Sequence, residues 1–429
     1  MTKNNTSRRK FLAASATLSA AATSMVHSSS AKAQESQEVR IGIVGCGGRG
    51  RGALQDSLAI NSNVKVVAAA DLYEKNCQVA RTLTGKKYPD KVDIAEDRMY
   101  GGLDGYKRIL DDKEVDLVFL TTSPGFRPYH ILEAVEAGKH VFAEKPSCVD
   151  PAGYQVCLKA DARAKENHTA IVTGTQYRRQ TNYIGAVEQI RKGTIGDIVS
   201  AQSRYCSNGI WYRNRKPGQS DAEYQMFNWM HFIWLSGDQI AEQAVHNIDA
   251  MNWVMGSAPE SAYGSGGRFT RPKDSEMWDN VCIDYVYPGN KVLSFMCRQI
   301  PDTKGDNGNI IFGTEGICYI SAMSGGSKIT DYDGNDIWKL GGSIGDAYKQ
   351  EHKDLVDSIV SGNPIVELKQ TADSSLTAVM GRMAAYTGQQ VTWDFVTTQS
   401  KLDLFPKKLT WDGELPDPQH AVPGKTKLI

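Results

Sequence analysis

The feature that most constrains the fold is a short β-branched run that breaks into three spaced glycines. The run covers residues 39–44, and Gly45, Gly47 and Gly50 follow it in the pattern Gly-x-Gly-x-x-Gly. In a dinucleotide-binding βαβ unit, the first glycine permits a tight turn, the second lets the backbone approach a pyrophosphate, and the third lets the next helix pack on the sheet. The helix N-terminus then faces the phosphates. The pattern predicts a nucleotide site at the start of a doubly wound α/β sheet.

An acidic residue ends the second predicted strand, at the distance expected of a ribose ligand. Residues 64–71 are mostly apolar and end in Asp71. A carboxylate at this position accepts hydrogen bonds from the ribose hydroxyls and repels a 2′-phosphate. The sequence therefore predicts NAD as the cofactor, in preference to NADP. Gly48 and Arg49, inside the glycine loop, are expected to contact the same cofactor.

The N-terminal residues resemble an export signal of the twin-arginine type. Residues 7–12 read Ser-Arg-Arg-Lys-Phe-Leu, a weakly apolar stretch follows, and residues 31–33 read Ala-Lys-Ala, as at a cleavage site. Crossing a membrane takes ~20 predominantly apolar residues, so no membrane span is expected here. The sequence predicts removal of residues 1–33 and a periplasmic mature protein. A disordered basic tail is the alternative.

Charge and cysteine content exclude several classes of function. Lysine plus arginine and aspartate plus glutamate both total 49, so no net field attracts nucleic acid or an anionic membrane. The eight cysteines are scattered, with no Cys-x-x-Cys pair and no Cys/His cluster at metal-ligand spacing. We therefore expect no metal centre, and a small substrate that is neutral or weakly charged.

The chain after the signal divides into two domains and an arm. Residues 34–160 alternate strand and helix patterns, which predicts a parallel, doubly wound Rossmann domain. Residues 161–401 contain strand patterns with few helices between them, which predicts an α+β domain with a large, mainly antiparallel open sheet. Residues 402–429 hold four prolines and are expected to form a C-terminal arm.

Two further motifs of the first half end predicted strands. Thr121, Thr122 and Pro124 close one strand, and His130 lies at the start of the helix that follows. The next strand finishes in Glu144-Lys145-Pro146. In a doubly wound sheet, ligands bind at this carboxyl edge, so the residues expected to contact the cofactor here are Thr121, Thr122, Pro124, His130, Glu144 and Lys145. A lysine there, held by a neighbouring glutamate and a proline-fixed backbone, is well placed to reach a bound nicotinamide and its substrate.

The second half supplies a partner motif on a predicted helix. Glu242, His246 and Asp249 share one helical face. An isolated histidine on a helix is usually a core residue, but the Glu-x-x-x-His-x-x-Asp spacing favours a site. Arg178 follows a strand and is a candidate to grip substrate hydroxyls or a carboxylate, with a solvated charge pair as the alternative.

Aromatic residues are concentrated in the stretch from 205 to 234. Aromatic rings stack on the apolar faces of sugars, while Arg and Asn bond the hydroxyls, so Trp211, Tyr212 and Arg213 are candidates for substrate specificity. Core packing is an equally ordinary role for Trp229 and Trp234.

These motifs together resemble the glucose–fructose oxidoreductase, inositol dehydrogenase and rhizopine catabolism family, Gfo/Idh/MocA. The resemblance implies a Rossmann domain followed by an α/β domain whose open sheet faces the substrate and often builds oligomers, so a homodimer or homotetramer is expected. It implies that Lys145 touches cofactor and substrate and that His246 accepts a hydroxyl proton. Glu242 stands where the family usually has aspartate, beside the substrate. Asp249 is expected to be structural or to orient His246.

The predicted function is hydride transfer between NAD and a hydroxyl carbon of a sugar, glycoside or cyclitol. Two alternatives stay open. One is a glycosidase or lyase that retains its NAD, oxidises a ring hydroxyl transiently, releases an aglycone and returns the hydride. The other is a sugar-binding protein without catalysis on a Rossmann scaffold.

Overall fold

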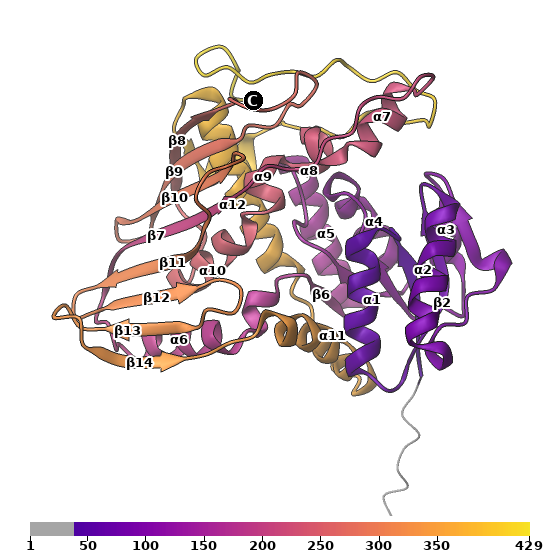
Figure 1. Ribbon diagram of the computed structural model, residues 1–429, viewed down its shortest axis with the longest axis horizontal. Coiled ribbons are helices and arrows are strands. Elements are labelled where there is room, and N and C mark those ends of the chain that lie inside the picture. Colours follow the sequence, from indigo (N-terminus) through magenta and orange to yellow (C-terminus); the bar gives the residue numbers. More distant parts are fainter. Residues whose placement is uncertain (1–37) are drawn as a thin grey trace, which may run out of the picture. The chain divides into compact units, whose positions relative to one another are not determined.

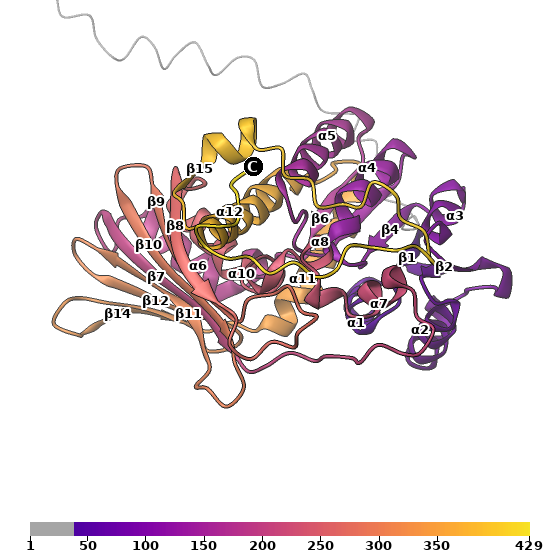
Figure 2. The same cartoon turned by 90° about the horizontal axis from the view of Figure 1, so that it is seen from above.

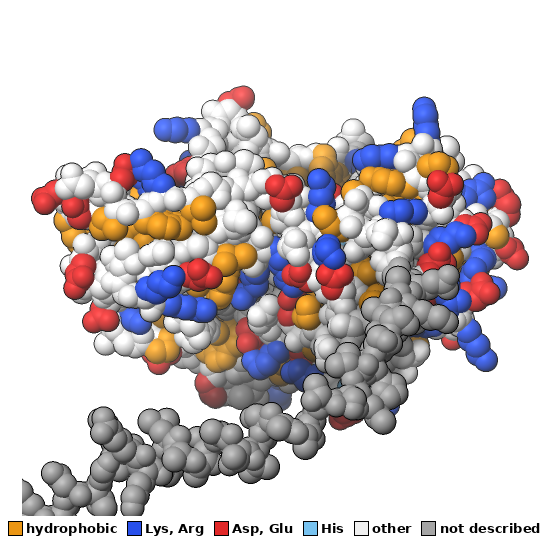
Figure 3. All heavy atoms as spheres, turned by 90° about the horizontal axis from the view of Figure 1, so that it is seen from below, with side chains coloured by type: hydrophobic (Ala, Val, Ile, Leu, Met, Phe, Trp, Pro, Cys, Tyr) orange, Lys and Arg blue, Asp and Glu red, His pale blue; other side chains and the backbone are white. Residues whose placement is uncertain are grey.

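The computed structural model describes residues 38–429, so the predicted export signal lies outside the described residues. None of the helices in this part of the chain combines the length and apolar character that a membrane crossing requires. On the described surface shown in Figure 3, basic and acidic side chains are interspersed without a broad area of one sign.

The first half forms a parallel sheet of six strands with helices on both faces (Figure 1). The strand order is β3-β2-β1-β4-β5-β6, and every pairing is parallel. Its central strands are buried apolar runs, as strands covered on both faces must be. The strands are β1 Val39–Val44, β2 Val64–Asp71, β3 Met99–Gly101, β4 Leu117–Leu120, β5 His140–Ala143 and β6 Ile171–Thr173. This confirms the predicted Rossmann architecture.

Five helices connect these strands, and two of them have proline in the first turn. They are α1 Gly48–Ile60, α2 Glu74–Lys87, α3 Gly105–Asp111, α4 Arg127–Glu136 and α5 Pro151–Asn167. For example, α5 has proline at its first position, and the Asp150 side chain accepts a hydrogen bond from the Gly153 amide at 2.6 Å. The sheet also continues past residue 160, because β6 pairs with β5 rather than joining the second domain.

The second half is built on a nine-stranded sheet in the order β14-β13-β12-β11-β7-β10-β9-β8-β15. Its pairings are antiparallel except between β7 and β10, which confirms the predicted mainly antiparallel sheet. The strands are β7 Ile198–Ser207, β8 Ser261–Gly267, β9 Asn280–Tyr287, β10 Lys291–Gln299, β11 Asp306–Gly313, β12 Ile317–Ser321, β13 Ser327–Thr330, β14 Asp336–Leu340 and β15 Val391–Thr392.

Helices cover only one face of this sheet (Figure 2). They are α6 Thr181–Arg191, α10 Val245–Met255 and α12 Leu368–Thr387, which contact β12, β7 and β8 respectively. The strands alternate buried and more exposed residues accordingly, as β9 and β10 show. The uncovered face is where an oligomer is expected, and the oligomeric state stays a prediction.

The two halves are joined by helices that pack across both. Helix α11 (Ile344–Val360) packs on α1, and α12 packs on α5. His352 of α11 is buried against Phe119 and Phe142, with ring centroids at 5.2 and 4.3 Å. One apolar core therefore runs from the first sheet into the second.

Residues 402–429 contain no helix or strand and run as an extended arm (Figures 1 and 2). The arm passes along the first half as far as the short helix α7 (Asp221–Phe227), which belongs to the aromatic-rich stretch. Ser220 caps α7, because its hydroxyl accepts a hydrogen bond from the Glu223 amide at 3.0 Å.

Candidate active site

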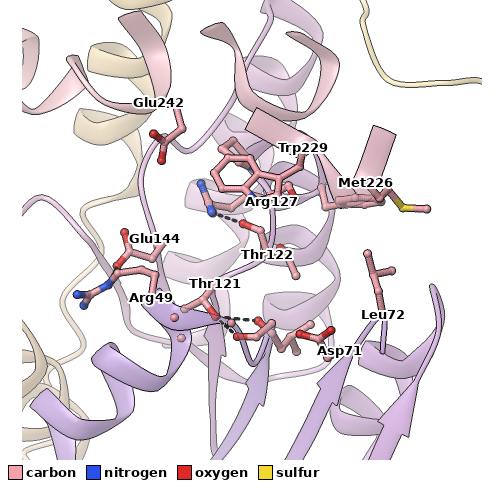
Figure 4. Close-up of a pocket in the computed structure, with 18 of the residues that line it drawn as sticks. Arg49, Asp71, Leu72, Thr121, Thr122, Arg127, Glu144, Met226, Trp229 and Glu242 are labelled. Atoms are coloured by element: carbon pink, nitrogen blue, oxygen red, sulfur yellow. Dashed lines mark hydrogen bonds and ion pairs between the residues drawn. The ribbon is translucent and has the colours of Figure 1, made fainter. Parts of the chain in front are cut away.

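A cavity of about 650 Å³ lies at the carboxyl edge of the first sheet (Figure 4). Both halves of the chain line it, so completing it requires their association. From the first half come the glycine loop, the ends of β2 and β4 and the residues after β5. From the second half come parts of the aromatic-rich stretch and of helices α9 (Asp238–Glu242), α10 and α11.

The glycine loop has the geometry that a pyrophosphate requires. Gly45 has a φ of +96°, and a Cβ there would lie 2.8 Å from the backbone carbon of Thr121. A Cβ on Gly50 would lie 2.1 Å from the Gly45 carbonyl oxygen. By contrast, a Cβ on Gly47 or Gly48 would meet nothing within 4 Å, and both glycines line the cavity. The loop is therefore tight where it packs and open where a phosphate would approach.

Asp71 is held at the rim of the cavity by the loops on either side of it. Its carboxylate accepts hydrogen bonds from the amides of Cys46 and Tyr73, at 2.7 and 3.0 Å, and from the Asn76 side chain at 2.8 Å. Asp71 lines the cavity at the end of β2. The open glycine loop and this fixed carboxylate fit the phosphates and a ribose of a dinucleotide.

The β4 motif forms the floor of the cavity. The Thr121 hydroxyl donates a hydrogen bond to the Gly45 carbonyl at 2.6 Å, which connects the end of β4 to the glycine loop. Thr122, Pro124 and His130 also line the cavity. Burial, followed by the charge of Arg127, lowers the pKa of His130 to about 3, so this imidazole is neutral.

Arg127 is a cavity residue that the sequence analysis missed. Its buried guanidinium donates to the carbonyl of Thr122 and to that of Pro146, the latter at 2.5 Å. It therefore holds together the ends of β4 and β5, which carry separate motifs. No pattern in the sequence pairs an arginine at the start of α4 with these carbonyls.

Lys145 and Glu242 form an ion pair between the two halves. The Lys145 Nζ lies 3.0 Å from the Glu242 Oε1 and also donates to the Glu242 carbonyl. The two side chains are only 13% and 12% exposed. An ammonium carries three donors and Glu242 takes two of them, so one donor is left for a ligand oxygen in the cavity.

Glu144, predicted to contact the cofactor, is bonded to Arg49 of α1. The Arg49 Nε donates to the Glu144 Oε1 at 2.5 Å, and the guanidinium lies 4.6 Å from the centroid of the Tyr348 ring of α11. All three residues line the cavity. Arg49 therefore connects the glycine loop to the residue that precedes Lys145. Tyr348 is a second cavity residue that sequence reasoning did not find.

His246 projects from α10 into the same cavity as Lys145. Its Nδ1 is buried and has no hydrogen-bond partner among the described residues, and its ring lies 5.4 Å from the Tyr177 ring. Burial, followed by the charges of Lys145 and Arg49, lowers the pKa of His246 well below its usual value. The imidazole is therefore neutral at neutral pH and can accept a proton.

Arg178, a candidate either to grip the substrate or to form a charge pair, is not among the residues that line the cavity and pairs with Asp249. Its Nε and one terminal nitrogen donate to the two carboxylate oxygens of Asp249 at 2.9 and 2.8 Å. Asp249 also accepts a hydrogen bond from the Ser374 hydroxyl at 2.8 Å. Asp249 is thus a structural residue, because it binds Arg178 and Ser374 rather than His246.

We expect Arg178→Ala to reduce stability rather than substrate affinity. The ion pair between Arg178 and Asp249 is mostly buried, so removing the guanidinium should lower the free energy of unfolding by about 3–5 kcal/mol. Urea unfolding measures this. Arg204→Ala, which removes an exposed partner of Asp306, is the matched control and should change stability little. An unchanged unfolding midpoint with a raised KM would instead assign Arg178 to the substrate.

The three specificity candidates occupy different places. Trp211 and Arg213 line the cavity, and the Arg213 guanidinium stacks on the Trp211 and Phe227 rings at 4.5 and 4.6 Å. Tyr212 does not line the cavity, because its hydroxyl is hydrogen-bonded to that of Tyr224 at 2.8 Å. The local sequence cannot show which of three consecutive side chains faces inward in an irregular segment.

Trp229 and Trp234 differ in their surroundings. Trp229 lines the cavity, whereas Trp234 is buried and donates from its indole to Gln225 at 2.7 Å. Within residues 38–429, no group of three or more His, Cys, Asp or Glu side chains is placed to hold a metal ion.

Two family patterns match this chain. One, described as the oxidoreductase family with an NAD-binding Rossmann fold, covers residues 39–174. The other, the GFO/IDH/MocA C-terminal domain, covers residues 183–319.

Curated relatives are distant and match over part of their length. The inositol 2-dehydrogenase of Salmonella typhimurium is 25% identical over 220 residues, which is 51% of this chain and 54% of that protein. An uncharacterized oxidoreductase of Streptococcus pneumoniae is 27% identical over 42% of this chain and 45% of its own length. The chain thus spans about half the length of these relatives.

Solved structures resemble the chain in fold. An aldose-aldose oxidoreductase from Caulobacter crescentus, complexed with glycerol, is 17% identical with a TM-score of 0.65, over 83% of this chain and 100% of that one. A levoglucosan dehydrogenase in complex with NADH and levoglucosan is 16% identical with a TM-score of 0.64, over 83% and 99%. At these identities the likeness shows the fold alone.

Proposed function

Because this chain belongs to the Gfo/Idh/MocA family of oxidoreductases with an NAD-binding Rossmann fold, we propose that it transfers a hydride between a nicotinamide nucleotide and a hydroxyl carbon of a sugar or cyclitol. One observation carries the proposal. Lys145 from the first half meets Glu242 and His246 from the second half, in the cavity that the glycine loop opens.

The side chains supply the binding and proton-transfer parts of this reaction. The free donor of Lys145 binds the substrate oxygen, and Glu242 fixes the position of that ammonium. The neutral His246 accepts the hydroxyl proton as the carbon is oxidised. The nucleotide, when bound along the glycine loop and Asp71, supplies the hydride acceptor. The aromatic residues Trp211 and Trp229 supply apolar surface for the substrate or the nucleotide.

The substrate class rests on the family and its members. Relatives are named inositol 2-dehydrogenases, and one structural neighbour was solved with levoglucosan. A panel of cyclitols, aldoses and aryl glycosides tests the proposal with NAD and NADP. We expect one of these compounds to lose a pair of hydrogens, seen by mass spectrometry, with one equivalent of reduced nucleotide. Release of the aglycone without net reduced nucleotide would instead identify the NAD-retaining glycosidase or lyase.

Asp71 is proposed to select NAD over NADP. We expect Asp71→Ala to weaken NAD binding by about 10–100-fold, the equivalent of one hydrogen bond to a charged group. The same variant should have a smaller ratio of NAD affinity to NADP affinity than the parent protein. Titration calorimetry with both nucleotides measures this. Asp71→Asn is the matched control, because it keeps the size of the side chain but removes the charge that repels a 2′-phosphate. A variant that keeps the full preference for NAD would contradict this role.

A further inference from the structure

Two segments of the second half lie beside the cavity near Asp71: Met226, Phe227 and Trp229 of the first line the cavity, and the second packs against the first from outside. Together these two segments form what we call the clasp. It consists of residues 220–229, which include α7, and residues 404–415 of the C-terminal arm. Both run to the end of the first sheet near β2 and α3 (Figures 1 and 2). Met226 of the clasp lies opposite Leu72, which directly follows Asp71 (Figure 4).

Tyr73 connects the nucleotide site to both segments of the clasp. Its ring packs edge-on against Trp411 of the arm, with centroids 5.3 Å apart. Its hydroxyl donates to the Glu223 carboxylate at 3.2 Å. Burial and Glu223 raise the pKa of Tyr73 to about 12, so the phenol keeps the proton that it donates. Tyr73 also lines the cavity, and its amide bonds Asp71.

The two segments of the clasp are hydrogen-bonded to each other. The Ser220 hydroxyl donates to the Trp411 carbonyl at 2.6 Å. The Ala222 amide donates to the Gly413 carbonyl at 3.2 Å. Because Ser220 also caps α7, displacing the arm would remove support from that helix.

An apolar cluster seals the clasp to the cavity wall. Phe405 of the arm packs against Phe126 and Tyr129, with ring centroids at 5.6 and 4.8 Å. The cluster joins Leu72 and Phe126 of the cavity wall to the clasp residues Met226, Trp229, Phe405 and Trp411. Opening the clasp exposes these aromatic and aliphatic groups to water, which opposes opening.

We propose that the clasp retains the nicotinamide nucleotide in the cavity between turnovers, with Trp411 and Glu223 as its closing contacts. This rests on the proposed function, because it requires that the cavity bind such a nucleotide. The nucleotide then leaves only when residues 220–229 and 404–415 separate from Leu72 and Tyr73.

The release rate of bound NADH tests this directly. The purified protein is loaded with NADH and mixed with a large excess of NAD, and the fluorescence of the bound nucleotide is followed. We expect Trp411→Ala to accelerate release at least tenfold and Glu223→Gln at least threefold. Val422→Ala is the matched control, since it alters an exposed residue of the same arm beyond the clasp, and it should release NADH at the parent rate.

The outcomes separate this inference from the proposed function. Release at the parent rate in both Trp411→Ala and Glu223→Gln would overturn the clasp while leaving hydride transfer intact. If Trp411→Ala does not fold, the conservative Glu223→Gln variant alone decides in the same way. A parent protein that binds no nicotinamide nucleotide would overturn the proposed function and the clasp with it.

Discussion

Replacing His246 by alanine is expected to lower kcat for hydroxyl oxidation by about 10²–10⁴-fold, the usual contribution of a general base. The substitution removes the unpartnered imidazole that lies in the cavity with Lys145. Nucleotide affinity should stay nearly unchanged, because the glycine loop and Asp71 supply the predicted nucleotide contacts. Steady-state kinetics and NAD titration measure the two effects separately. His420→Ala, at an exposed histidine, is the control.

The pH dependence of the parent enzyme gives a second readout of the same role. The base must be unprotonated, so kcat/KM falls as the pH falls through its pKa. Since burial, Lys145 and Arg49 lower the pKa of His246, this fall is expected below the ordinary histidine value of about 6.5. A fall of kcat/KM centred at about pH 6.5 or higher would contradict the role of His246 as the base. A His246→Ala variant with the kcat of the parent enzyme would contradict it as well.

Replacing Lys145 by alanine should lower kcat to an extent similar to that of His246→Ala, but for a different reason. The ammonium loses its contact with the substrate oxygen, which we expect to cost about 10²–10³-fold in kcat, as for other lost stabilising donors. Glu242 is also left mostly buried without its cation, so unfolding should become easier by a few kcal/mol. Kinetics and chemical unfolding of the same preparation measure both losses.

A double variant separates these two consequences of removing Lys145. Lys145→Ala combined with Glu242→Ala removes both charges, so it should regain part of the stability lost in the single variant. It should regain no activity, because the donor to the substrate oxygen is still missing. Activity that returned with stability would show that Lys145 acts only by supporting the fold. A single variant with parent kcat would exclude Lys145 from the reaction.

The parts of the site that the sequence predicted lie at short, regular distances from the ends of predicted strands or from each other. The glycine loop and Asp71 follow two strands at fixed distances, and Lys145 ends a third. Glu242 and His246 were placed on one helical face because four residues are about one helical turn, but the structure puts them on two helices, α9 and α10, with a turn at residues 243–244 between them. Both residues nevertheless line one cavity, whereas Asp249 of the same predicted face does not and binds Arg178 instead.

The parts that the sequence could not predict depend on contacts between distant segments. For Arg178 the sequence left open a substrate contact or a charge pair, because nothing in its neighbourhood indicates that Asp249, on another element, binds its guanidinium. Tyr348 reaches the cavity only because α11 returns to pack on α1. The strand β6 was placed in the second domain, since a short apolar run does not specify which sheet it joins.

The most direct test of hydride transfer is the near-ultraviolet absorbance of the nicotinamide in the purified protein. The protein is incubated with NAD and cyclitols, aldoses or aryl glycosides, in parallel with His246→Ala. We predict that at least one of these compounds produces the absorbance of reduced nicotinamide with the parent protein, and that His246→Ala produces it at least a hundredfold more slowly. A parent protein that binds NAD but reduces it with none of these compounds, and forms no aglycone, would contradict the account and favour a sugar-binding protein without catalysis.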